Sequence, residues 1–190
     1  MRMLAGVEAP HAGTVRIDGH DLWREEVAAR LAIAYVPEQP DLTPYATVGE
    51  VLRLVADLRH QPAAAGTSAL ARAGLDGLGA RSIRELSMGQ RRRAVLAAAW
   101  IGEPRVILLD EPLESLDRAT RDVALAWVDE RLRAGATLIV VTHDLAPFVA
   151  SATRVVTLRD GMPMMYEPLP ADPAARARLL DVIARGEIPA

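Results

Sequence analysis

Hydrophobic and polar positions in the second half of the chain repeat one theme, in which helix-like segments alternate with short, wholly apolar runs. The apolar runs are too short for helices and carry many β-branched residues, so they predict buried strands. Alternating helices and buried strands are typical of a parallel sheet covered on both faces. The expected strands are Val106–Leu109, Thr137–Val141 and Arg154–Leu158, and the expected helices are Met88–Ile101, Arg118–Arg133 and Asp144–Ala150.

The first half is less regular and mixes strand and helix signals. Thr14–Ile17 alternates like a half-buried strand and runs into an Asp18-Gly19 turn. Thr47 and Glu50 have the spacing of a capping box, which predicts a helix start. Further expected elements are a strand over Leu31–Val36, a Pro-, Ala- and Gly-rich connector over His60–Ser68, a short helix over Ala69–Ala73, and a Pro-rich link followed by a C-terminal helix that ends near Arg185.

Composition narrows the class of protein. The chain has 190 residues, a hydrophobic share of 51% and a formal net charge of −3. This share supports a packed core, and the charge lacks the basic surplus of a typical nucleic-acid binder, so no nucleic-acid partner is expected. There is no cysteine, which excludes disulfides and thiolate metal sites. No apolar run reaches the roughly 20 residues that a membrane-spanning helix needs.

Two adjacent carboxylates, Asp110 and Glu111, follow the apolar strand Val106–Leu109. They are expected at the carboxyl edge of the sheet, where open α/β sheets bind ligands. There Asp110 can hold Mg²⁺, directly or through water, and Glu111 can polarise an attacking water. The alternative interpretation is a strand that exits to solvent with ordinary exposed acids.

A second candidate lies in Ser87, Gly89 and Gln90, at the start of a predicted helix. Ser87 and Gln90 have capping-box spacing, which by itself predicts a capped helix. The helix N-terminus, a hydroxyl and a bare glycine backbone also suit a phosphate. The run 91–93 is all arginine, and such a run is expected to be a solvated face.

His143 comes two residues after the strand Thr137–Val141. A lone histidine is more often structural or simply exposed. If the strand lies beside the Asp110 strand, however, His143 adjoins Glu111 and can contact a terminal phosphate or orient a catalytic water.

Taken together, these segments resemble the ATP-binding cassette (ABC) ATPase family over roughly residues 1–165. Leu86–Gln90 is similar to its signature motif, Val106–Glu111 to its Walker B strand with the catalytic glutamate, and His143 to its switch histidine. Ser115-Leu116-Asp117 resembles the D-loop, which makes Asp117 a nucleotide-site residue. Tyr35–Pro40 resembles the Q-loop, with either Glu38 or Gln39 as the sensor; its Glu-Gln-Pro form is similar to cassettes of exporters.

The chain departs from the family pattern in several places, among them Glu38 at the usual position of the Q-loop glutamine. The Walker A loop, Gly-x-x-Gly-x-Gly-Lys-Ser/Thr, is expected immediately before Met1 and is not in these 190 residues, which contain no lysine at all. That loop supplies a backbone nest, a cation and a Mg²⁺ ligand, and its strand is expected centrally in the sheet, so that neighbouring strand edges stay unpaired. Met88 replaces the first signature glycine.

The resemblance implies a P-loop NTPase-like α/β fold with a mostly parallel sheet, flanking helices and an inserted helical subdomain, from which the first strand and the phosphate loop are missing. It places the ATPase domain at 1–166, the helical subdomain at about 41–101, and the C-terminal linker and helix at 167–190.

The implied function is the ATP-hydrolysing subunit of an ABC transporter. Its cofactors are ATP and Mg²⁺, and its partners are a transmembrane permease subunit and a second cassette, in a homo- or heterodimer. It would be cytoplasmic and held at the membrane by the permease. The alternative is a non-catalytic cassette that contributes only its signature helix to a partner's ATP. An ABC protein acting on ribosomes or DNA is disfavoured by the single cassette and the negative charge.

Overall fold

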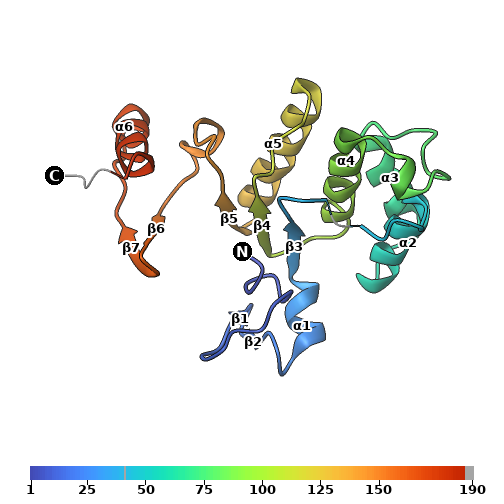
Figure 1. Ribbon diagram of the computed structural model, residues 1–190, viewed down its shortest axis with the longest axis horizontal. Helices are drawn as coiled ribbons and strands as arrows, with labels where there is room; N and C mark the ends of the chain where they lie inside the picture. Colours follow the sequence, from blue (N-terminus) through green and yellow to red (C-terminus); the bar gives the residue numbers. More distant parts are fainter. Residues whose placement is uncertain (41, 187–190) are drawn as a thin grey trace. The chain divides into compact units, whose positions relative to one another are not determined.

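The computed structural model describes residues 1–40 and 42–186 (Figure 1). They fall into two compact units, Met1–Val141 and Thr142–Ala190, and each unit is described by itself. Among the described residues, no helix has both the length and the apolar character needed to cross a bilayer.

A three-stranded parallel sheet forms the centre of the first unit. Strand β4 (Val106–Asp110) lies between β3 (Ile33–Val36) and β5 (Thr137–Val141). The three carboxyl ends therefore meet at one edge of the sheet, as the alternating pattern predicts for a parallel sheet. The α/β fold class is confirmed.

Burial differs sharply between the two apolar strands. Ile107, Leu108 and Leu109 of β4 are at most 2% exposed, so this strand is covered on both faces. In β5, Ile139 is 38% and Val141 is 49% exposed. Within the described residues, β5 pairs with β4 alone and is an edge strand of this sheet.

Helices α2 (Val48–Leu58), α3 (Ala64–Arg72) and α4 (Met88–Ala99) pack against one another beside the sheet (Figure 1). The close approach of α2 and α3 requires Gly66, because a Cβ there would lie 3.3 Å from the carbonyl carbon and oxygen of Leu52. Residue 41, where the expected helical subdomain begins, lies outside the described residues.

The prediction for α3 is wrong in its start. The helix begins at Ala64, inside the stretch expected to be a connector, and not at Ala69. Alanine has the highest helix propensity, and the single Gly66 is tolerated because it packs on α2. Composition rich in Ala and Gly was a poor guide to a loop here.

The capping box that opens α2 is present as predicted. The Thr47 hydroxyl accepts from the Glu50 amide at 3.2 Å, and the Glu50 carboxylate accepts from the Thr47 amide at 2.8 Å. These hydrogen bonds to the carboxylate hold the pKa of Glu50 below its ordinary value. Gly49, in the first turn of α2, donates its amide to the carbonyl oxygen of Gly79 at 2.8 Å. This hydrogen bond ties the start of α2 to the loop before α4.

An antiparallel hairpin precedes the sheet. Strands β1 (Arg16–Ile17) and β2 (His20–Asp21) are joined by Asp18 and Gly19, both with positive φ (52° and 85°). Two central residues with positive φ make the type of turn whose twist matches a two-residue hairpin. The Asp18-Gly19 turn is therefore confirmed.

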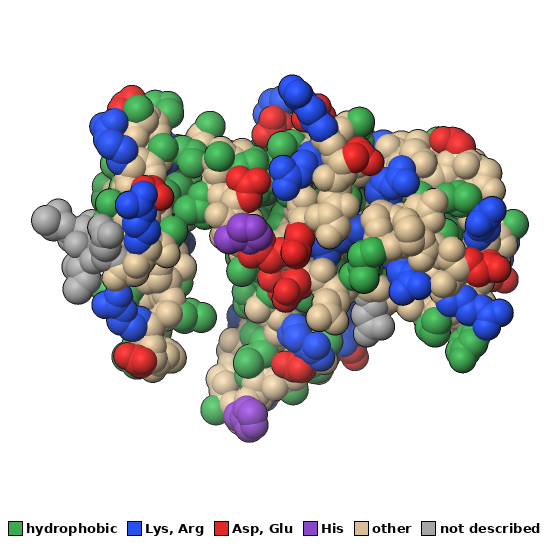
Figure 2. Space-filling model, turned by 45° about the horizontal axis from the view of Figure 1, so that its top comes forward, with side chains coloured by type: hydrophobic (Ala, Val, Ile, Leu, Met, Phe, Trp, Pro, Cys, Tyr) green, Lys and Arg blue, Asp and Glu red, His purple; other side chains and the backbone are tan. Residues whose placement is uncertain are grey.

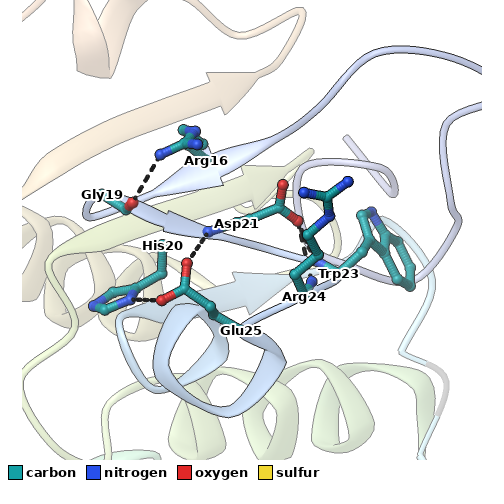
Figure 3. A network of polar contacts seen from close by, with 7 residues as sticks. All are labelled: Arg16, Gly19, His20, Asp21, Trp23, Arg24 and Glu25. Atoms are coloured by element: carbon teal, nitrogen blue, oxygen red, sulfur yellow. Dashed lines mark hydrogen bonds and ion pairs between the residues drawn. The ribbon is translucent and has the colours of Figure 1, made fainter.

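Polar contacts join this hairpin to helix α1 (Glu26–Leu31), as Figure 3 shows. The Asp21 carboxylate accepts from the amides of Trp23 (3.0 Å) and Arg24 (3.1 Å). Glu25 accepts from the Asp21 amide at 3.1 Å, and its other oxygen lies 2.9 Å from His20 Nδ1. The donors to these two carboxylates lower the pKa of Asp21 and of Glu25.

A core cluster lies between this hairpin, α1 and one face of the sheet. Its buried members are Ile17, Leu22, Ala29, Ala32, Ile33 and Leu108.

The remaining helices of the first unit are the 3-10 turn η1 (Ile83–Glu85) and α5 (Arg118–Arg133). Basic and acidic side chains are interspersed over the face seen in Figure 2.

The second unit corrects two expectations. The segment expected to be a helix over Asp144–Ala150 contains only a 3-10 turn, η2 (Ala146–Phe148), with Pro at its start. Strand β6 (Val155–Arg159) is not a buried parallel strand; it pairs antiparallel with β7 (Met162–Tyr166) across an Asp160-Gly161 turn. An Asp-Gly pair between apolar runs is a strong hairpin signal, and the sequence reasoning passed over it.

The C-terminal helix α6 (Pro173–Ala184) is capped by Asp172 and ends beside the expected Arg185. Arg176 fastens this helix to the end of η2. Its Nη1 donates to the carbonyl oxygens of Val149 (3.1 Å), Ala150 (2.9 Å) and Ala152 (3.0 Å). The guanidinium thus donates hydrogen bonds to carbonyl oxygens that lie outside any helix or strand.

Candidate functional site

Asp110 and Glu111 lie at the carboxyl edge of the sheet, where the sequence predicts them. Asp110 is opposite Val141 in the β4–β5 register, and the Glu111 amide donates to the Val141 carbonyl oxygen at 2.8 Å. Both side chains are half-buried. Glu111 has a φ of 46°, a left-handed conformation that is uncommon for a residue with a side chain. Strained backbone of this kind clusters at functional sites.

The fully buried Arg92 of α4 reaches this edge from the helical side. Its exposed fraction is 2%. Nη2 donates to the carbonyl oxygens of Asp110 (3.0 Å) and Glu111, and Nη1 donates to those of Glu38 (2.6 Å) and Pro37. Burial lowers the pKa of Arg92, and the surrounding carboxylates, including Asp110 and Glu111, partly offset that effect.

The expectation that residues 91–93 are a solvated face is therefore wrong. Each arginine holds the backbone of a different segment: Arg91 donates to the carbonyl oxygen of Arg84 at 3.0 Å, and Arg93 donates to that of Gly74 at 3.1 Å. The helical geometry explains the difference, because three successive residues point in three directions about 100° apart.

Helix α4 begins as a capped helix. The Ser87 hydroxyl accepts from the Gln90 amide at 3.3 Å, and Gln90 Oε1 accepts from the Ser87 amide at 2.9 Å. Met88 is 59% exposed. A Cβ on Gly89 would lie 3.6 Å from the carbonyl oxygen of Ser115, so the signature-like turn and the D-loop-like segment are in contact. The capping box is confirmed, and the anion site stays a prediction.

Asp117 caps α5. Its Oδ1 accepts from the Thr120 amide at 2.8 Å, and this hydrogen bond is the main reason that the pKa of Asp117 lies below its ordinary value. Two residues before it, Ser115 has a φ of 59°. The D-loop-like segment is thus a turn with a left-handed residue that ends in a helix cap.

Glu38 and Gln39 follow β3 at the same edge of the sheet, and both side chains are exposed. Their segment is fixed through its backbone by Arg92. The choice between the two as the sensor stays open.

His143 belongs to the second unit. The Thr142 hydroxyl accepts from the Asp144 amide at 3.0 Å, which closes a small turn around it. Its proximity to Glu111 stays a prediction.

The carboxylates at this edge suit a magnesium ion that keeps most of its water, and they do not form a site made of protein ligands alone. Among the described residues, no group of three or more His, Cys, Asp or Glu side chains gathers as a metal site. Mg²⁺ usually keeps water and takes one or two carboxylates together with substrate phosphates. Asp110 as a Mg²⁺ ligand stays a prediction.

Sequence reasoning missed Arg92, which donates to four backbone carbonyl oxygens at this edge. A signal existed: an arginine at 92 lies four residues before Leu96, on the buried side of α4. Tyr35 was also missed as a neighbour of Asp110. Burial and the Asp110 charge raise the pKa of Tyr35.

Comparisons with known proteins agree with this geometry. A family model described as "ABC transporter" matches residues 1–114. The chain is 34% identical over 165 residues to the Fe(3+) ions import ATP-binding protein FbpC 1 of Rhizobium meliloti (strain 1021), covering 85% of this chain and 47% of that protein. It is 38% identical over 169 residues to the Hemin import ATP-binding protein HmuV of Jannaschia sp. (strain CCS1), covering 81% and 61%. The chain thus spans about half the length of the curated relatives that it matches.

Solved structures show the same fold. An ATP-binding subunit of an ABC transporter superposes with a TM-score of 0.81 at 24% identity, covering 97% of this chain and 81% of the other. A dimeric ATP-binding cassette in a post-hydrolysis state, bound to ADP and Pi, superposes with a TM-score of 0.73 at 24% identity, covering 86% and 77%. From the match of the family model and the identity to these relatives, the chain belongs to the ABC transporter family.

Proposed function

We propose that this chain is part of the ATP-hydrolysing subunit of an ABC importer. The observation that carries the proposal is the meeting of Asp110 and Glu111 with the β5 end at the carboxyl edge of a parallel sheet. The names of the relatives, which are import proteins, support import over the export direction hinted at by the Glu-Gln-Pro sequence.

Each candidate residue takes a role in this proposal. Asp110 holds Mg²⁺, directly or through a water, and Glu111 orients the attacking water. His143 contacts the terminal phosphate. When bound, Mg²⁺ neutralises charge that develops on the phosphates.

The signature-like turn acts on a second cassette. Ser87, Gly89 and Gln90 face the nucleotide of the partner, beside Asp117. A helix N-terminus with a bare glycine suits a phosphate. Glu38 or Gln39 senses the nucleotide state. The ATPase domain covers residues 1–166, with its helical subdomain at about 41–101, and residues 167–190 form the linker and C-terminal helix.

The proposed partners are a transmembrane permease subunit and a second ATPase subunit. The protein acts at the cytoplasmic face of the membrane, held there by the permease. ATP is the cofactor whose hydrolysis drives transport.

The decisive experiment compares Glu111→Gln with Glu114→Gln in the full-length protein. Both remove one negative charge from the same loop, and Glu114 is exposed. Glu111→Gln is expected to lower kcat for ATP hydrolysis by on the order of 100-fold while ATP binding is retained. Glu114→Gln is expected to leave kcat nearly unchanged.

An unchanged steady-state rate in Glu111→Gln shows that the catalytic assignment is wrong. The non-catalytic alternative has its own signature. The protein then binds no ATP in a direct titration, yet it raises hydrolysis by a second, complete cassette, and Ser87→Ala abolishes that increase.

A further inference from the structure

Arg92 is unusual because a full positive charge is buried with carbonyl oxygens as its partners. At 2% exposure, its guanidinium donates to four backbone carbonyls: two follow β3, at Pro37 and Glu38, and two end β4, at Asp110 and Glu111. Burying a cation costs free energy unless hydrogen bonds compensate for lost water. A residue retained at that cost, and in contact with two loops at once, is placed to join them.

The second observation is the backbone of Glu111. Its φ of 46° is left-handed, and both of its backbone polar groups are held: the amide donates to Val141 at 2.8 Å, and the carbonyl accepts from Arg92. Such a conformation persists only where surrounding contacts over-determine it. Arg92 therefore helps to hold the backbone that aims the Glu111 side chain.

The geometry suits arginine and no other side chain. The planar guanidinium presents five N–H donors in a fixed fork. Here Nη1 donates to the segment after β3, and Nη2 donates to the carboxyl end of β4. A lysine ammonium is a single point and cannot reach both pairs of acceptors in the same way.

We propose that Arg92 is a positioning residue that couples the Glu38-Gln39 segment to the Glu111 carboxylate. A shift of the segment after β3 is passed through one rigid guanidinium to the backbone of Glu111. Sensing at Glu38 or Gln39 and orientation of water by Glu111 then become one mechanical unit. The inference rests on the proposed catalytic role of Glu111.

The first test needs no activity. Amide hydrogen exchange is measured in Arg92→Gln and in the control Arg93→Gln. The control removes the same charge from the same helix, but the Arg93 side chain donates to the Gly74 carbonyl oxygen instead. Arg92→Gln is expected to raise exchange by about tenfold at the end of β3 (Tyr35 and Val36) and also at Glu111 and Glu114, whose amides are hydrogen-bonded, since the carbonyls beside them lose their donor. Arg93→Gln is expected to raise exchange near Gly74 and to leave both loops unchanged. A rise in one loop only, or in neither, overturns the proposal.

The second test uses kinetics in the full-length protein. Arg92→Gln is expected to lower kcat by on the order of 100-fold with KM for ATP nearly unchanged, because a misplacement of about 1 Å costs that much. Arg92→Lys keeps the charge and is expected to recover part of kcat, which also covers the case in which Arg92→Gln does not fold. Unchanged kcat in both variants, with kcat lost in Glu111→Gln, overturns the positioning role. If Glu111→Gln also retains kcat, the proposed function fails, and hydrogen exchange still decides whether Arg92 couples the loops.

Discussion

The guanidinium of Arg92 donates to the carbonyl oxygen of Glu111, the residue that follows the central strand of the sheet. This contact joins the helix that begins with the signature-like turn to the carboxylate proposed to activate water. A helix usually contacts a sheet through apolar side chains. Here the contact is polar and directed at a left-handed residue, so it fixes orientation as well as proximity.

Gly49→Ala is expected to destabilise the protein. A Cβ at Gly49 would lie 3.0 Å from the carbonyl oxygen of Gly79, so the helix start and the loop would have to separate. Overpacking of this kind costs about 1–3 kcal/mol, which outweighs the gain in helix propensity. The free energy of unfolding in urea measures the effect.

Gly79→Ala is the matched control for that change. A Cβ at Gly79 would meet only the end of the Leu70 side chain, at 3.7 Å. The added methyl group is therefore expected to leave the free energy of unfolding nearly unchanged in Gly79→Ala and to lower it in Gly49→Ala. Equal losses in the two variants would show that the contact is not tight.

Much of the first unit was predictable because its signals are local. The apolar run at β4, the capping boxes at Thr47 and Ser87, and the Asp18-Gly19 turn each depend on neighbours within four residues. The placement of Asp110 and Glu111 then followed from the general rule that parallel strands share a carboxyl edge.

Arg92 could not be placed in the same way. Its acceptors lie 18 or more residues away in sequence. The spacing to Leu96 places Arg92 on the buried side of α4, but it does not say which backbone segments the guanidinium contacts. The failures at α3 and β6 have local causes instead. The high helix propensity of alanine extends α3 back to Ala64, and the Asp160-Gly161 turn pairs β6 with β7.

Arg59→Ala is expected to lower the free energy of unfolding by about 3 kcal/mol, because two buried carbonyls lose their donor. Arg59 follows α2, and its guanidinium donates to the carbonyl oxygens of Ile101 (2.6 Å) and Ile33 (2.8 Å). Burial lowers the pKa of Arg59 below its ordinary value. Urea unfolding measures the loss, with the exposed Arg53→Ala of the same helix as the control.

Arg59→Met separates the two contributions of this side chain. Methionine keeps much of the apolar stem and removes the hydrogen bonds. A loss close to that of Arg59→Ala assigns the stabilisation to the carbonyl contacts. A loss no greater than that of Arg53→Ala in either variant would contradict the structural role.

Asp117→Asn is expected to change the pH dependence of stability. The pKa of Asp117 in the folded state lies below its ordinary value of 3.8, chiefly because its carboxylate accepts from the Thr120 amide. Its stabilisation is therefore fully present above that ordinary value and is lost as the pH falls through the folded-state pKa. The wild type is expected to be more stable than Asp117→Asn at pH 7, and the difference is expected to narrow by about pH 3.

Thermal unfolding at several pH values measures that difference. Asp122→Asn removes the same charge from an exposed position inside the same helix and controls for net charge. A gap between wild type and Asp117→Asn that stays constant from pH 7 to pH 3 would refute a charged helix cap.

Asp110→Asn is expected to lower the pKa of Tyr35. Tyr35 is opposite Leu108 in the β3–β4 register, and Asp110 lies two residues further on β4, so both side chains belong to one face of the sheet. Burial is the main reason that the pKa of Tyr35 is raised, and the Asp110 charge is the next. Removing that charge leaves burial in place, so the pKa falls but stays above its ordinary value of 10.0.

Absorbance of the phenolate reports the titration once Tyr45 and Tyr166 are replaced by Phe, which leaves Tyr35 as the only tyrosine. Glu111→Gln removes the same charge from the neighbouring position and is expected to lower the pKa of Tyr35 less; an equal or larger effect would mean that Asp110 does not share a face with Tyr35.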